Sequence, residues 1–185
     1  DYYASRGLGD VYKRQGYIIS TKGGDCLKLS SSYVQAIGIL VMLAELPENE
    51  SLKASEISKR MNVSHTYLQK IASKLKHADL IESYASKQGG YKLNKPKEEI
   101  NFLDIFLAVE GENQFLSQVN LEPIHAMFMD KELIKEKSDV VKKIHSNAQE
   151  IYFEQLRSHR LTEILPKTAD DDFLMIDWKK IVNEE

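Results

Sequence analysis

The chain has 185 residues, of which 42% are hydrophobic, and its formal net charge is -3 at pH 7. This length and apolar content suit one domain, or one domain with an appended element. The longest strongly apolar run, residues 37–43, is far shorter than the roughly 20 residues that a membrane-spanning helix needs, and we recognise no signal peptide. The single cysteine, Cys26, excludes an intramolecular disulfide and any cysteine-based metal site within one chain. We therefore expect a cytoplasmic, globular protein without a membrane segment.

Residues 1–26 contain several glycines and show no clear periodicity. Such a pattern is typical of a segment outside a folded domain. The stretch GLGDVYKRQ within it resembles a translated sequencing adaptor. We expect this leader to be non-native or disordered, and we assign no redox role to Cys26.

Charge is distributed unevenly along the chain. Residues 59–97 contain nine lysines and arginines against two acids, a local charge of +7, whereas the acids gather mainly in the C-terminal half. Local fields matter more for phosphate binding than the total charge does. The basic segment is therefore compatible with nucleic-acid binding, and equally with lysines that are simply solvated on exposed helix faces.

Three helices are predicted in the first half of the chain. Residues 31–46 are apolar nearly all round, so this helix should be buried on several sides before Pro47 ends it. A second helix spans residues 54–61, and Ser64 then offers a side-chain cap to a third helix, residues 65–78. The third helix has a polar outer face and an apolar stripe at the spacing of a buried face. The stripe comprises Leu68, Ile71, Ala72, Leu75 and Ala78.

A small hairpin and a fourth helix follow. Strands at residues 80–85 and 90–93 flank a basic loop that contains the glycines a hairpin tip requires. Asn101 then caps a further helix, which Gly111 ends. Residues 112–130 have weak periodicity and are expected to be a loop or an irregular segment.

One long helix, residues 131–165, dominates the C-terminal part. Apolar residues recur in it at three- and four-residue steps, so its stripe requires a partner surface. Residues 166–185 form a tail with Trp178 and Ile181, which either docks on the domain or stays loose. The stripe comprises Val141, Ile144, Ala148, Ile151, Tyr152 and Leu156.

This order of elements predicts the fold class. Three helices followed by a two-stranded hairpin are the parts of a winged helix-turn-helix, so we expect a mostly α protein with a small β-hairpin wing. In such a domain the third helix buries one face and offers polar groups to base edges in the major groove. Gln69 and short hydroxyls suit that role, and Lys70 and Lys74 suit phosphate contact. Alternatively, Ser64 is only a helix cap and Tyr67 only a packing residue.

Four motifs between residues 27 and 111 carry a family resemblance. They are LKLSSSYVQAIGILVMLAEL, SEISKRMNVSHTYLQKIASKLKHADLIES, GGYKLNKPKEEI and FLDIFLAVEG. In this order and spacing they resemble the Rrf-type bacterial transcription regulators, which include IscR, NsrR and CymR. The resemblance implies a homodimer paired through the long C-terminal helix, which the stripe from Val141 to Leu156 fits. We expect a repressor, or otherwise an activator, that binds double-stranded DNA at a pseudo-palindromic operator.

The resemblance also implies which residues bind DNA. The base-reading positions of the family fall on Ser64, Thr66 and Gln69, with His65 and Tyr67 beside them. Relatives often have Glu at the position of Gln69, and because Gln donates as well as accepts, the base preference there should differ. The full expected set is Ser64, His65, Thr66, Tyr67, Gln69, Lys70, Lys74, Lys87 and Gln88.

The wing departs further from the family pattern. Where many relatives have an arginine before a glycine-rich tip, this chain has Ala85, and Gln88 stands where glycine is common. The minor-groove contact of the wing is therefore in question, and Lys87 offers a substitute charge.

The largest departure concerns cofactors. Cluster-binding relatives have three cysteines in the loop before the long helix, and residues 112–130 contain none. Thiolate ligation of an iron–sulfur cluster needs those sulfurs, so we expect no cluster, and regulation by a small molecule or a partner protein, if any. The scattered His125, His145 and His159 lack metal-ligand spacing and are interpreted as surface or interface residues.

Two other classes of function are open to the sequence. It shows no Gly-rich phosphate loop, metalloprotease histidine pair or nucleophile elbow, which does not favour an enzyme. A protein-interaction module on a winged-helix scaffold is the stronger alternative, because the acidic half offers a surface for a partner. Salt distinguishes the two: DNA binding should weaken with ionic strength, with a log-log slope of about -0.9 per neutralised phosphate.

Overall fold

The computed structural model describes residues 29–84, 89–111, 120–127 and 129–184. This part of the chain is mostly helical with a small antiparallel sheet, which confirms the predicted fold class. The expected leader, residues 1–26, and the wing-tip residues Lys87 and Gln88 lie outside the described residues. The helices are α2 (Ser31–Ala44), α3 (Ala54–Met61), α4 (His65–His77), α5 (Phe102–Glu110), α7 (Glu122–Met127), α8 (Lys131–Ser158) and α9 (Trp178–Glu184), with a 3-10 turn η1 (Leu161–Ile164) and strands β1 (Ile81–Ser83) and β2 (Tyr91–Leu93).

Local sequence signals account for the boundaries of the first helices. The Ser30 side chain accepts a hydrogen bond from the backbone N–H of Tyr33 and so caps α2. Asn62 ends α3 in the left-handed conformation, with φ 52°, which asparagine tolerates better than most residues. Ser64 then caps α4 by accepting from the backbone N–H of Tyr67. Between α3 and α4 the chain therefore makes the tight turn of a helix-turn-helix.

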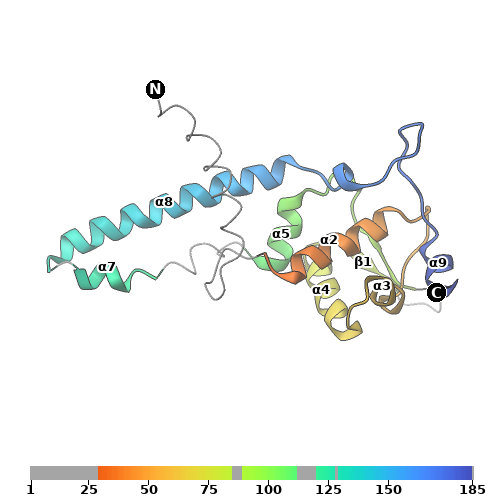
Figure 1. Ribbon diagram of the computed structural model, residues 1–185, viewed down its shortest axis with the longest axis horizontal. Coiled ribbons are helices and arrows are strands. Elements are labelled where there is room, and N and C mark those ends of the chain that lie inside the picture. The colour runs from red at the N-terminus through yellow and green to blue at the C-terminus, as the bar shows by residue number, and fades with distance from the viewer. Residues whose placement is uncertain (1–28, 85–88, 112–119, 128, 185) are drawn as a thin grey trace, which may run out of the picture.

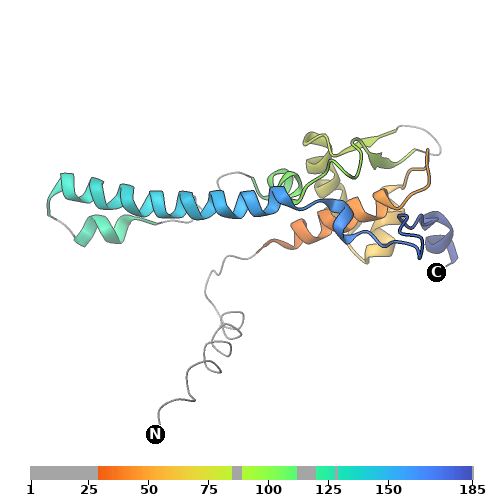
Figure 2. The same cartoon turned by 90° about the horizontal axis from the view of Figure 1, so that it is seen from above.

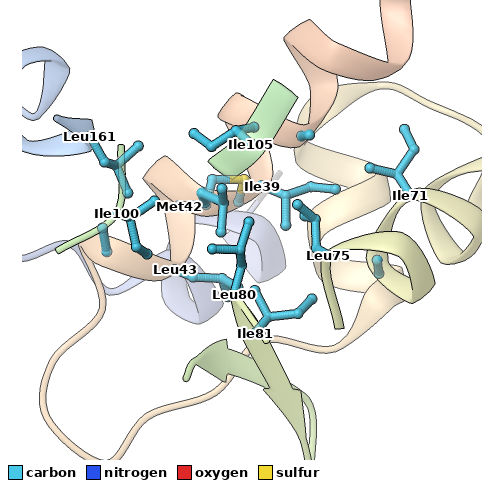
Figure 3. Packing of buried hydrophobic residues seen from close by; sticks show 14 of the residues in the cluster. Ile39, Met42, Leu43, Ile71, Leu75, Leu80, Ile81, Ile100, Ile105 and Leu161 are labelled. Carbon is cyan, nitrogen blue, oxygen red and sulfur yellow. The ribbon is translucent and has the colours of Figure 1, made fainter. Parts of the chain in front are cut away.

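The hydrophobic core lies where α2, α4, α5 and the base of the sheet meet. The helix α2 is buried along most of its length, as its apolar sequence predicted. Figure 3 shows how side chains from these elements converge. They include Ile39, Met42 and Leu43 of α2, Ile71 and Leu75 of α4, Leu80 and Ile81 at the start of the sheet, and Ile105 of α5.

A main-chain bridge joins the hairpin to the loop before α3. Ile81 pairs with Leu93 within the hairpin, and Leu52 pairs with Tyr91 outside it. The two backbone hydrogen bonds of the Leu52–Tyr91 bridge measure 3.0 and 2.7 Å. A Cβ added at Gly90 would collide with the Leu52 carbonyl group, so this close approach of two backbones requires glycine.

The long helix α8 projects away from the helix-turn-helix, with α7 beside its far end, as both views show (Figure 1, Figure 2). Its last turns pack on α5: the Phe153 ring lies 5.7 Å from that of Phe106, and the Tyr152 ring 5.6 Å from it. The helix α7 falls within residues 112–130, where a loop or irregular segment was expected, and Pro123 occupies its first turn, where proline is tolerated. No helix of the described residues is long and apolar enough to cross a bilayer.

The long helix is shorter than the predicted span of residues 131–165, because α8 ends at Ser158. His159 takes an extended conformation, and its carbonyl accepts a hydrogen bond of 3.1 Å from the Phe102 backbone N–H. The Leu161 N–H then donates to the Ile100 carbonyl at 2.9 Å. Leu161 and Leu165 are buried through η1 and its exit. Their apolar spacing reflects burial against the core and not a continued helix.

Candidate nucleic-acid interface

The helix α4 has one buried and one exposed face. Leu68, Ile71 and Leu75 are almost inaccessible to solvent, which fixes the rotation of the helix about its axis. The exposed residues at its N-terminal end are His65, Thr66, Gln69 and Lys70. Within the part of the chain that the structure describes, these four side chains make no hydrogen bond or ion pair. They therefore present donors and acceptors to solvent from a rigid support.

Tyr67 turns back toward the scaffold and not outward. Its hydroxyl lies 2.5 Å from that of Ser32 and 3.4 Å from that of Ser31, and its ring packs partly buried against the core. These serine hydroxyls lower the pKa of the Tyr67 phenol. Ser64 serves as the cap of α4. For both residues, the structure shows the structural role that the sequence left open.

Lys74 also makes a contact within the protein. Its Nζ donates a hydrogen bond of 2.7 Å to the Val109 carbonyl oxygen, in the last turn of α5. A cation at this position satisfies one of the carbonyls that a helix end leaves unpaired. The sequence predicted that Lys74 and Lys70 both contact phosphate. Among the described residues, Lys74 has a hydrogen-bond partner within the protein and Lys70 has none.

Other bases of the segment from residue 59 to 97 are similarly engaged. Lys76 Nζ donates to the Ser83 hydroxyl at 2.7 Å, and Lys92 pairs with Glu82 at 3.2 Å. Hydrogen bonds from Tyr84 and then from Lys92 lower the pKa of Glu82. Lys76 and Lys92 therefore already have partners within the protein.

The predicted DNA contacts of the wing are at the tip of the hairpin. Lys87 and Gln88, both predicted to contact DNA, lie outside the described residues, as does Ala85. Their contacts with DNA stay a prediction. Lys92 lies behind the tip, with its Nζ 4.5 Å from the centre of the Tyr84 ring.

The predicted dimerisation stripe divides into two sets. Ile144 and Ile151 are 61% and 73% exposed, Ala148 is exposed and Val141 is half-buried, so this set has a free apolar surface. Tyr152 and Leu156, in contrast, pack against the protein's own core. These two were predicted to contact a second protomer; in the structure both are partly buried against the core, and Tyr152 contacts Phe106 of α5.

Sequence reasoning missed two residues of α8. Val140 is 49% exposed and extends the free apolar surface, since it stands four residues before Ile144 on the same face. Phe153 is buried and contacts Phe106. The sequence did contain an indication of this role. Phe153 lies about half a turn around the helix from Ile151 and Ile144, and a large aromatic side chain there indicates a second apolar face.

Comparisons with known proteins place this geometry in a family. Residues 29–167 match the model of the Rrf2 family, described as iron-dependent transcriptional regulator. The chain belongs to the Rrf2 family. This confirms the resemblance carried by the four motifs. Rrf2 proteins are transcriptional regulators, which agrees with the expectation that the chain is not an enzyme.

Individual Rrf2 relatives match parts of the chain. A Lactococcus lactis protein named as an HTH-type transcriptional regulator, YffB, is 39% identical over 51% of this chain and 61% of its own length. The regulator IscR of Cereibacter sphaeroides is 40% identical over 45% of this chain and 56% of its own length. The chain thus spans little more than half the length of these curated relatives.

Solved structures resemble the fold over a larger share of the chain than these two relatives match in sequence. The structure of CymR, the global cysteine regulator of B. subtilis, covers 75% of this chain and 96% of its own, with 25% identity and a TM-score of 0.52. The IscR structure from T. potens covers 77% of this chain and 88% of its own, with 22% identity and a TM-score of 0.54. The second likeness is one of fold alone.

The description of the Rrf2 family as iron-dependent raises the question of a metal site. The whole sequence has one cysteine, Cys26, which lies outside the described residues. Residues of the described ranges contain no group of three His, Cys, Asp or Glu side chains placed to hold a metal ion. A cluster held by three cysteines of one chain does not fit this donor set.

Proposed function

We propose that this protein is a sequence-specific DNA-binding transcriptional regulator that reads the major groove with α4. The observation that carries the proposal is the set of unengaged polar side chains on the exposed face of α4. His65, Thr66, Gln69 and Lys70 stand there above a fully buried apolar face. Membership of a family of transcriptional regulators supports it. Tyr67 and Lys74 act as supports of α4 in this proposal, and Gln69 as the principal base-reading residue.

The proposed active form is a homodimer paired through α8. Val140, Ile144 and Ile151 expose a contiguous apolar strip on a helix that projects from the domain, and a second copy of the same helix would cover it. A two-fold dimer presents two copies of α4, so the operator should be a pseudo-palindrome with half-sites about one helical turn of DNA apart.

The finer aspects of the proposal follow the family resemblance. The protein would repress genes near its operator in the bacterial cytoplasm, and a small molecule or a partner protein would supply any signal. We propose that it holds no iron–sulfur cluster ligated by three cysteines, because the sequence has only one. Iron and sulfide analysis of the purified protein, prepared without oxygen, tests this point directly.

The decisive experiment is selection of genomic fragments by the purified full chain at about 50 and about 200 mM salt. Recovery of a palindromic consensus whose occupancy falls steeply with salt supports the proposal. Recovery of no consensus at either salt contradicts it and favours a protein-interaction module.

A matched pair of variants then tests the site itself. Gln69→Ala should change the preferred base at one position of each half-site, at a cost of about 1–3 kcal/mol for the original base. Ser73→Ala, on the exposed face of the same helix but farther from its N-terminus, should leave the consensus unchanged. An unaltered consensus in Gln69→Ala would remove Gln69 from the base-reading set.

A further inference from the structure

The C-terminal segment, residues 166–184, folds back on the helix-turn-helix. It begins with a tight hairpin, in which the Thr168 N–H donates to the Asp172 carbonyl at 2.8 Å and the Leu174 N–H to the Pro166 carbonyl at 2.9 Å. It ends in α9, which lies beside α3 in both views (Figure 1, Figure 2). The Rrf2 match stops at residue 167, so nearly all of this segment lies beyond the part that the family model describes.

Specific contacts hold the C-terminal segment in place. The Ile176 N–H donates to the Glu45 carbonyl at 2.7 Å, and Trp178 Nε1 donates to the Glu45 carboxylate at 3.1 Å. Lys179 forms an ion pair with Glu50. Val182 is buried against the domain. The contact is nevertheless small, because a seven-residue helix provides few buried side chains and is marginal on its own.

The C-terminal segment engages basic residues of the domain. Lys59 Nζ, in the last turn of α3, donates to the Val182 carbonyl, and the Arg60 guanidinium lies 5.4 Å from the Trp178 ring centre. Farther along, Lys97 Nζ lies 4.2 Å from the Phe173 ring centre. All three bases belong to the locally basic segment, residues 59–97.

The C-terminal segment also has a net negative charge, which favours its contact with these basic residues. Residues 166–184 contain five acids against three lysines. The DNA backbone is likewise a polyanion, and the first helix of a helix-turn-helix crosses that backbone. In α3, the candidate phosphate ligands next to the turn into α4 are Lys59 and Arg60, which the C-terminal segment holds.

We infer that Lys59 and Arg60 form a second phosphate-binding surface of the helix-turn-helix, whose two cationic groups the C-terminal segment engages when DNA is absent. This inference rests on the proposed function. DNA and the C-terminal segment compete for the two side chains, so binding to the operator releases α9 from α3. The segment thus limits the electrostatic, sequence-independent part of DNA binding and leaves base reading by α4 unchanged.

Salt titration of DNA binding by full-length variants tests the competition. Trp178→Ala removes the ring over Arg60 and the bond to Glu45, so it should bind unrelated DNA several-fold more tightly at about 50 mM salt. The log-log salt slope should steepen by about 1–2 for each protomer, because each contacts one or two more phosphates. Met175→Ala, in the same segment but exposed, is the matched control and should behave as the wild type. In a Lys59→Ala, Arg60→Ala background, Trp178→Ala should have no such effect.

Fluorescence provides a second test on the unaltered protein, because Trp178 is the only tryptophan of the chain. Trp178 is half-buried in the docked state. Saturation with operator DNA should move its emission to longer wavelength, toward that of the same protein unfolded in denaturant. An unchanged spectrum at saturation would show that the segment stays docked on the complex, and this would overturn the inference.

The outcomes separate the inference from the proposed function. If Trp178→Ala lowers the melting temperature and binds DNA no more tightly, with an unchanged slope, the segment only stabilises the fold and the inference is wrong. If the wild type shows no salt-dependent DNA binding at all, the proposed function itself fails. Tighter binding by Trp178→Ala cannot arise from unfolding, because an unfolded domain loses α4 as a reading surface.

Discussion

Lys74 Nζ donates a hydrogen bond of 2.7 Å to the carbonyl oxygen of Val109. The ammonium group of a lysine on the proposed recognition helix therefore contacts the last turn of α5. The same turn continues into Glu110, whose carboxylate accepts hydrogen bonds from the Ser30 backbone and hydroxyl groups. Thus α4 is bonded to the end of α5, which in turn is bonded to the start of α2.

The two lysines of α4 should respond differently to replacement. Lys70→Ala should leave the unfolding free energy unchanged and reduce the log-log salt slope of DNA binding by about 0.9 for each protomer of the dimer. Lys74→Ala should cost about 0.5–1.5 kcal/mol of stability, because a buried carbonyl loses its donor. Chemical denaturation together with salt titration measures both. Equal effects of the two variants on the salt slope would show that Lys74 contacts phosphate after all.

A charge in the proposed dimer seam should separate the protomers. Ile151→Asp would bury an unpaired carboxylate in that seam, so we expect monomers at micromolar concentration. Ser146→Asp, exposed on the opposite side of the same helix, is the matched control and should remain dimeric. Light scattering distinguishes the two states. A dimeric Ile151→Asp protein would place the seam on another surface.

Replacement of two glycines by alanine should change the unfolding free energy by different amounts. Gly90→Ala forces a Cβ into the Leu52 carbonyl group and to 3.0 Å from the Lys53 backbone nitrogen, and we expect a loss of about 1–3 kcal/mol. Gly38→Ala places a Cβ 2.9 Å from the Met61 Cε, the end of a flexible side chain that is able to move. It also gains helix propensity of about 1 kcal/mol, so it should be near neutral. Similar midpoints of denaturation for the two would contradict the backbone contact.

Alkaline pH should weaken the fold through Tyr33. Burial raises the pKa of Tyr33 to about 12, with smaller contributions from Tyr152 and Glu110. The ordinary phenol pKa is about 10, so between these values the unfolded chain releases a proton that the folded chain keeps. The stability that this group contributes is therefore complete below about pH 10 and lost as the pH rises toward 12.

Replacement of the phenol isolates this contribution from other titrating groups. The Tyr33 hydroxyl is buried and has no hydrogen-bond partner in the described part of the chain, so Tyr33→Phe should fold normally at neutral pH. Its unfolding free energy should fall less than that of the wild type between about pH 9 and 11. Parallel losses in both proteins would show that Tyr33 does not titrate with a raised pKa.

The helix-turn-helix was predictable because its signals are local. Ser64 and Asn101 are capping residues whose side chains reach only three residues along the chain. The buried stripe of α4 follows directly from its spacing. Asp79, just after α4, takes the left-handed conformation with φ 56°, which aspartate tolerates better than most residues. These signals do not depend on what the rest of the chain packs against.

The roles of polar and C-terminal residues depended on distant partners and were not predictable. Nothing in the sequence around Lys74 reveals that α5 ends beside it. The periodicity of α8 likewise does not say which of its two apolar faces meets the protein's own core, so Tyr152 was grouped with Ile151. The docking of Trp178 on Glu45 joins residues 133 positions apart, beyond the reach of any local pattern.

The bridge between Leu52 and Tyr91 makes the orientation of the hairpin largely independent of the side chains at its tip. The direction of the hairpin is set by main-chain bonds, which any non-proline residue forms, and by the single glycine at position 90. Substitutions at the hairpin tip therefore alter what the wing offers to a ligand without turning it. Ala85 could therefore replace an arginine, and Gln88 a glycine, without a change in the direction of the hairpin. Such replacements would change what the wing recognises and leave its orientation as it was.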